Sequence, residues 1–217
     1  HQRKQLAADL TGALDSDGKW LYRLVAVGRD SNSQVDHVPD GRVVLAPSLT
    51  WRPSADTSLT LQALYQRDKS GSLISFFAWQ GTRLPSPYGR IPTHTFISEP
   101  GWDKYDTRNR SIGYLFSHRL NADWTVRQNL RRTVTDVDYR TLYTSFRANP
   151  AAGRPARPVF NADNLTFPRD ASWQKNGGKM LLVDTQLEGH VRTGPVEHTL
   201  LAGLDVQRNS TTASNWS

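Results

Sequence analysis

The chain has 217 residues, of which 37% are hydrophobic and 10% aromatic, enough for an ordinary folded core. Basic residues outnumber acidic ones by 27 to 20, giving a net charge of +7, but they are scattered and form no basic helix or stripe, which argues against nucleic-acid binding. The absence of cysteine excludes disulfides and thiolate metal sites. No apolar run approaches the ~18 residues of a membrane-spanning helix, so any membrane crossing must be made by strands.

The first third of the chain is predicted to form two β-hairpins. Apolar and polar residues alternate with a period of two, the pattern of strands with two different faces, and each segment has about eleven residues. The four segments are 4–14, 19–29, 42–52 and 57–67. Turn residues at 15–18 and 53–56 join them in pairs, so we expect two tight hairpins.

The second half repeats this pattern after a long interruption. Alternation resumes in the segments 111–119, 124–134, 179–191 and 197–209. One face of segment 124–134 is wholly polar and consists of Thr125, Arg127, Asn129, Arg131 and Thr133. A soluble core does not readily explain such a face, whereas a water-filled or plugged barrel lumen does.

Short turns and long loops alternate along the chain. The turns near Ser16, Ala55, Ala122 and Gly194 span about three to five residues, whereas the connections that begin near Asp30, Asp68 and Asp136 are predicted to span about 12, 40 and 40. Trp20, Trp51 and Trp124 lie close to short turns, as interfacial aromatic residues do in membrane barrels. The predicted fold is therefore all-β: an antiparallel up-and-down transmembrane β-barrel. Because the long loops are too large for an eight-stranded barrel, we expect a partial one.

The first long loop contains the best candidates for ligand binding. Its stretch 71–81 includes Phe76, Phe77 and Trp79, which either pack within the loop or meet a ligand. Tyr139, Tyr143 and Phe146 are expected in the second long loop, which lies at the same end of the barrel and forms its mouth together with the first. Aromatic rings with Arg suit a compact organic ligand that already encloses its own chelated Fe³⁺, so no further cofactor is expected. The common catalytic motifs and metal-ligand spacings are missing, so we expect neither an enzyme nor a protein-ligated metal.

Several segments resemble the barrel of the TonB-dependent siderophore receptors, most closely those of the ferrichrome-iron, or hydroxamate, type. The segments are 51–53 with 59–61, 125–131, 183–187 and 198–205. The resemblance implies a barrel of about 22 strands in the bacterial outer membrane, of which residues 1–217 supply about eight. The plug domain and the TonB box are expected outside this chain, which begins at His1 as a mature segment or an excised fragment.

The resemblance also implies a ligand site and partners. Phe77 and Trp79 match the loop aromatics that contact the siderophore, with Phe77 where Tyr is typical, and Tyr143 and Phe146 fall near a further aromatic contact. The implied function is TonB-dependent uptake of a ferric hydroxamate siderophore, with the TonB complex acting through the plug and with outer-membrane lipid or lipopolysaccharide around the barrel. Arg23, Arg42, Arg127 and Arg131 either face the plug or solvate the lumen. A passive porin or adhesin barrel and a soluble carbohydrate-binding β-sandwich remain alternatives.

Overall fold

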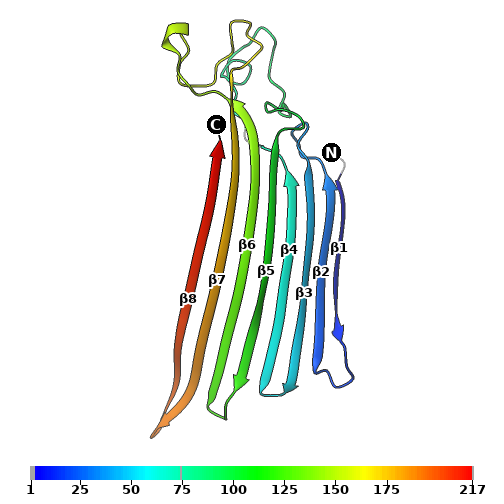
Figure 1. The fold of residues 1–217 in the computed structure, drawn as a ribbon, viewed down its shortest axis with the longest axis vertical. Helices are drawn as coiled ribbons and strands as arrows, with labels where there is room; N and C mark the ends of the chain where they lie inside the picture. The colour runs from blue at the N-terminus through cyan, green and yellow to red at the C-terminus, as the bar shows by residue number, and fades with distance from the viewer. Residues whose placement is uncertain (1–2, 74, 217) are drawn as a thin grey trace.

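The computed structural model describes residues 3–73 and 75–216, so the expected start at His1 lies outside the described residues. These residues form one sheet of eight antiparallel strands in the order of the sequence, with every strand hydrogen-bonded to the next (Figure 1). The strands are β1 (Arg3–Ala13), β2 (Trp20–Ser31), β3 (Asp40–Ser54), β4 (Thr57–Ser70), β5 (Lys104–Arg119), β6 (Trp124–Thr144), β7 (Arg169–Thr193) and β8 (Val196–Trp216). Among the described residues the only helix is the 3₁₀ turn η1 (Pro150–Ala152), and no helix is long and apolar enough to cross a membrane.

The strand register separates an apolar face from a polar face. Partners across neighbouring strands share a face. On the apolar face Leu61 lies between Leu49 and Tyr114, and on the polar face Gln62 lies between Ser48 and Gly113. The apolar face has no protein cover, since Leu6, Ile112 and Leu204 are 80%, 63% and 67% exposed. This face is therefore the lipid-facing side of the sheet and the polar face lines the lumen.

The sheet itself has no buried hydrophobic core. Among the described residues the buried apolar side chains are Val35, Val38 and Ala78, and all three lie in the loops. Hydrogen bonding between strands and burial of the apolar face in lipid must therefore stabilise the sheet. One sheet without a second sheet packed on it also makes the soluble β-sandwich alternative wrong for the described residues.

Four strands extend about seven to ten residues beyond the segments that the sequence pattern predicts. β5 begins at Lys104, β6 ends at Thr144, β7 begins at Arg169 and β8 ends at Trp216. The connections predicted to begin near Asp68 and Asp136 are therefore wrong in their bounds, because the long loops span 71–103 and 145–168. The cause is a change of composition: the outward residues Asp136, Asp138 and Arg140 replace the apolar ones, so the period-two signal disappears although strand pairing continues.

The short turns lie at the end of the sheet opposite the long loops (Figure 1). Trp20, Trp51 and Trp124 lie beside these turns, as the sequence indicates. Trp20 and Trp51 are register partners and stack with their ring centroids 5.8 Å apart. Trp124 covers Gly189 so closely that a Cβ at Gly189 would lie 2.4 Å from the indole ring. The aromatic residues near the turns therefore pack against the sheet and against one another.

Candidate ligand-binding mouth

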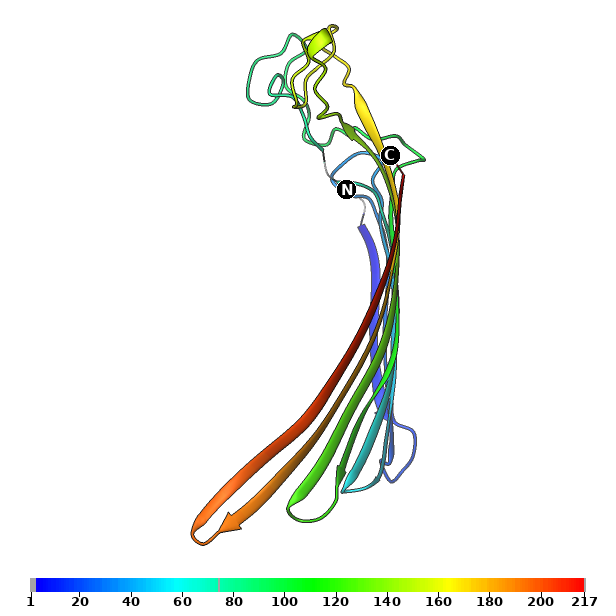
Figure 2. The ribbon, with the colours of Figure 1, turned by 60° about the vertical axis from the view of Figure 1, so that its left-hand side comes forward.

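Three loops gather at one end of the sheet and lean over one side of it (Figure 2). The 32–39 loop contacts the 71–103 loop through Asp36 and His94, whose carboxylate oxygen and ring nitrogen are 2.7 Å apart. Arg169, at the start of β7, donates hydrogen bonds to the carbonyls of Ile97 and Ser98, at 3.1 Å and 2.9 Å. The loops therefore contact one another as well as the strands.

The first long loop is anchored at its two ends. The backbone N–H of Ser72 donates a hydrogen bond of 2.7 Å to the carboxylate of Asp103. This bond joins the two ends of the loop, Gly71–Ser72 and Asp103, which we call its neck. The Ser72 hydroxyl lies 3.3 Å from the Tyr139 hydroxyl on the lumen face of β6. A Cβ at Gly71 would lie 2.5 Å from the Asp103 carboxylate, so the neck requires glycine at this position. The loop therefore starts directly above the lumen face.

Beneath this neck, a cavity of about 720 Å³ opens on the lumen face. Two ion pairs lie at one end: Arg29 with Asp40 at 2.6 Å, and Arg42 with Asp68 at 2.5 Å. The other end is aromatic because Tyr105 and Tyr139 pack edge to face, 5.2 Å between centroids. The loop residue Leu73 also lines this cavity. It combines an apolar wall with polar groups, as ligand sites do.

A second cavity, of about 470 Å³, lies between the two long loops. Its lining includes Phe77 and Arg90 from the first loop, and Phe160 and Phe167 from the second. Phe160 and Phe167 stack at 4.2 Å, and Phe77 meets Phe167 edge to face at 6.4 Å. Phe160 and Phe167 were not predicted as site residues because they lie in a segment without periodicity, and only its aromatic residues and neighbouring prolines distinguish that segment.

The four predicted ligand residues do not line one cavity. Phe77 lines the cavity between the loops, whereas Trp79 is 57% exposed and carries the guanidinium of Arg157 over its ring at 4.7 Å. Phe146 packs edge to face on Phe76 at 5.1 Å. Tyr143 lies on the lumen side of β6, not in the second long loop as predicted.

All four predicted arginines lie on the lumen face, and each has a partner within the barrel segment. Arg23 pairs with Asp9 at 2.7 Å, and Arg127 pairs with Glu188 at 2.7 Å. Arg42 pairs with Asp68, and Arg131 donates a hydrogen bond of 3.3 Å to Gln62. They therefore form a row of charged and polar contacts along the lumen wall.

In the second long loop, Asp163 stabilises the turn formed by residues 163–166. It accepts hydrogen bonds from the Thr166 hydroxyl and from the backbone N–H groups of Thr166 and Leu165. These hydrogen bonds, the one from the Thr166 hydroxyl foremost, hold the pKa of the Asp163 carboxyl below its usual value. Asp163 is therefore ionised at neutral pH, and its carboxylate is hydrogen-bonded within its own loop.

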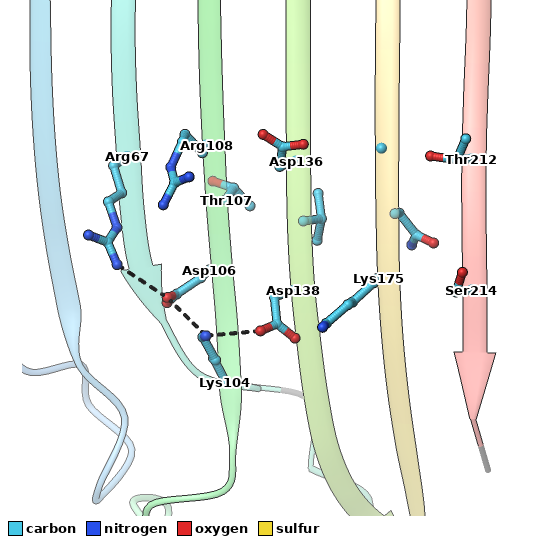
Figure 3. A pocket seen from close by; sticks show the side chains of 13 residues that line it. Arg67, Lys104, Asp106, Thr107, Arg108, Asp136, Asp138, Lys175, Thr212 and Ser214 are labelled. Carbon is cyan, nitrogen blue, oxygen red and sulfur yellow. Dashed lines mark hydrogen bonds and ion pairs between the residues drawn. The ribbon is translucent and has the colours of Figure 1, made fainter.

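On the opposite, lipid-facing side, a charged pocket of about 440 Å³ lies above the apolar band (Figure 3). Lys104 bridges Asp106 and Asp138, at 3.5 Å and 2.9 Å, and Arg67 approaches Asp106 to 3.8 Å. Lys175 lines the same pocket. Ion pairs therefore begin where the apolar side chains end. Within residues 3–73 and 75–216, no group of three His, Asp or Glu side chains is arranged to hold a metal ion.

The chain is similar to known outer-membrane receptors, although no protein-family model matches it. The ferrioxamine B receptor of Salmonella typhimurium strain SL1344 is 34% identical over 212 residues, which cover 97% of this chain and 28% of the receptor. The ferrichrome outer membrane transporter/phage receptor of Escherichia coli K12 is 30% identical over 222 residues, covering 98% of this chain and 29% of the transporter. Both relatives are transport receptors rather than enzymes.

Solved structures show the same fold. The ferripyoverdine receptor of the Pseudomonas aeruginosa outer membrane superposes with a TM-score of 0.79 at 20% identity, over 99% of this chain and 27% of the receptor. The Escherichia coli K12 ferric-catecholate import receptor Fiu, in its closed form, gives 0.76 at 19% identity, over 96% and 30%. The chain thus spans little more than a quarter of the curated relatives' length, 28% and 29%. It is a segment of an outer-membrane β-barrel homologous to the TonB-dependent siderophore receptors.

Proposed function

We propose that this segment belongs to a receptor that captures a ferric hydroxamate siderophore at the mouth and imports it in a TonB-dependent manner. The observation that carries the proposal is the agreement along almost the whole segment with relatives named for ferrioxamine B and ferrichrome. Aromatic side chains at the mouth, above all Trp79 and Phe77, support it because they offer flat apolar contacts to a compact chelate.

The absence of a hydroxyl at Phe77 bears on the ligand. Phenylalanine offers the same ring as tyrosine but no hydrogen-bond donor, and Phe77 already packs on Phe167. We therefore assign Phe77 an apolar contact and not an orienting hydrogen bond. The directional contacts would come from neighbouring polar groups such as Arg90, which lines the same cavity.

Energy transduction would depend on parts of the receptor outside this segment. We propose that a plug domain, with its TonB box, lies against the lumen face and engages the TonB complex. The row of contacts made by Arg23, Arg42, Arg127 and Arg131 supports this, because it places hydrogen-bonding groups along most of the length of the lumen wall. Arg23 is the most exposed of the three ion-paired arginines and the best placed to bind a second carboxylate.

The lipid partner we propose is lipopolysaccharide. Above the apolar band, the outward positions carry eleven basic side chains and four acidic ones. The basic ones are Lys4, Arg67, Lys69, Lys104, Arg108, Arg110, Arg132, Arg140, Lys175, Lys179 and Arg208, and the acidic ones are Asp30, Asp106, Asp136 and Asp138. A surplus of cations at this height suits the phosphate groups of an anionic outer leaflet.

The function is tested by uptake of radioactive iron. The full-length receptor is produced in cells that lack other hydroxamate receptors, and uptake of ferric ferrioxamine B and ferrichrome is compared for wild type and Trp79→Ala. We expect binding to weaken about 30-fold, because truncation of an aromatic anchor costs on the order of 2 kcal/mol. Trp20→Ala, which removes the same side chain at the opposite rim, is the control.

Two results would count against this function. If the wild-type receptor reaches the membrane folded but takes up neither chelate, it is not a hydroxamate receptor. If uptake proceeds normally without a functional TonB complex, the segment belongs to a passive barrel. If Trp79→Ala leaves binding and uptake unchanged, the function stands and the assignment of Trp79 is wrong.

A further inference from the structure

The charges of the two long loops are unevenly matched. Residues 71–103 contain two arginines, Arg83 and Arg90, and residues 145–168 contain three, Arg147, Arg154 and Arg157. The carboxylates in these ranges are Glu99, Asp103 and Asp163. Which charges neutralise one another depends on the contacts that each carboxylate makes.

None of the three carboxylates pairs with a loop arginine. Asp103 accepts the Ser72 backbone N–H at the loop neck, and Asp163 is engaged by its own turn. Glu99 pairs with Arg169 at 3.2 Å, at the base of the second loop. In the neighbouring 32–39 loop, Asp36 pairs with His94.

Four loop arginines consequently have no ion-pair partner among the described residues: Arg83, Arg90, Arg154 and Arg157. The fifth, Arg147, lies 3.5 Å from Asp170. Arg154 donates a hydrogen bond of 2.9 Å to the Arg147 carbonyl, which holds it in place without neutralising it. Uncompensated cations gathered in the two long loops raise the local concentration of anions around them.

These arginines lie beside the candidate ligand residues. Arg157 stacks on Trp79 at 4.7 Å, and the backbone N–H of Arg83 donates to the Trp79 carbonyl at 2.9 Å. Arg90 lines the same cavity as Phe77. A ligand that reaches either aromatic side chain therefore comes close to at least one guanidinium that has no carboxylate.

Resting on the proposed function, we infer that the mouth selects ferric hydroxamates that carry a net negative charge. Three hydroxamates balance the charge of Fe³⁺, so the substituents of the chelate set its net charge. A carboxylate substituent gains from Arg83, Arg90, Arg154 and Arg157, whereas an ammonium substituent is repelled by them. The preferred ligand class is a trihydroxamate chelate with a pendant carboxylate.

The test uses three chelates with one iron centre. These are ferric ferrioxamine B, whose terminal amine is protonated, its N-acetyl derivative, which is neutral, and its N-succinyl derivative, which ends in a carboxylate. Their dissociation constants for the purified full-length receptor are measured by fluorescence quenching at low and high ionic strength. We expect the succinyl form to bind about tenfold more tightly than the ammonium form at low salt, with the acetyl form between them and the difference reduced at high salt.

Charge variants assign the effect to the loops. In Arg83→Gln/Arg154→Gln, which leaves the stack on Trp79 in place, the succinyl preference should fall to about threefold. Arg157→Lys keeps the charge and should keep the preference. Arg192→Gln removes an exposed arginine near the last short turn, at the opposite end of the sheet, and serves as the control.

The outcomes separate the two claims. Equal affinity for the three chelates, or tighter binding of the ammonium form, overturns the charge preference and leaves the receptor function intact. A folded receptor that binds none of the three overturns both. A preference that stays tenfold in Arg83→Gln/Arg154→Gln overturns the assignment to the loop arginines, and so does one that falls equally in Arg192→Gln.

Discussion

The sheet and the long loops of this chain are stabilised in different ways. The sheet is held by a continuous ladder of strand pairs, and its apolar side chains face outward with no protein cover. The loops contain the fully buried Val38 and Ala78 and are joined by individual contacts such as Arg169 to the Ser98 carbonyl. The sheet therefore depends on its surroundings, whereas the loops form a small core of their own.

The strongest way to break this contrast is to place a charge on the apolar face. Leu45→Arg on β3 should destabilise the full-length receptor in lipid vesicles by about 2–4 kcal/mol, because the guanidinium would enter hydrocarbon. Val44→Arg, one residue away, points into the polar lumen and should cost far less. Urea unfolding in vesicles measures both. Equal destabilisation of the two variants would show that the assignment of faces is wrong.

A smaller effect is expected where an aromatic side chain rests on a glycine. A Cβ at Gly189 would lie 2.4 Å from the Trp124 ring, so Gly189→Ala must displace the indole and should cost about 1–3 kcal/mol. Gly178→Ala on the same strand is the control, because the nearest atom to its new Cβ would be 3.9 Å away. Unfolding followed by tryptophan fluorescence compares the two variants. If Gly189→Ala left the stability to unfolding unchanged, Trp124 would not pack on Gly189.

The same contrast explains how much the sequence predicts. The period of two located all eight strands, since an apolar face alternating with a polar one is visible in any single strand. The signal stopped where Asp136 and Asp138 replaced outward apolar residues, and so the strand status of Tyr143 was missed. The Trp79–Arg157 stack and the Phe77–Phe167 contact join residues far apart in sequence. No local pattern encodes such contacts.

Loosening the loops should leave the sheet intact. Arg169→Ala removes the guanidinium that binds the carbonyls of Ile97 and Ser98 and pairs with Glu99, a local loss of about 1–2 kcal/mol. We expect faster proteolysis within residues 71–103 and an unchanged midpoint of unfolding for the barrel. Arg192→Ala at the last short turn is the control. A lower barrel midpoint with no change in proteolysis would show that Arg169 supports the sheet rather than the loops.

The smallest effect concerns the outward charges, and it should depend on the lipid. Lys104→Gln removes the bridge between Asp106 and Asp138 and one cation of the charged pocket. In phosphatidylcholine vesicles the loss should stay below about 1 kcal/mol, the usual range for exposed ion pairs. In membranes that contain lipopolysaccharide it should be about 1 kcal/mol greater, because each basic side chain near an anionic surface contributes that amount. Lys19→Gln, near a short turn, should show no such difference. Only the lipid dependence separates a lipopolysaccharide contact from a simple ion pair, so equal losses in both membranes would argue against lipopolysaccharide at this pocket.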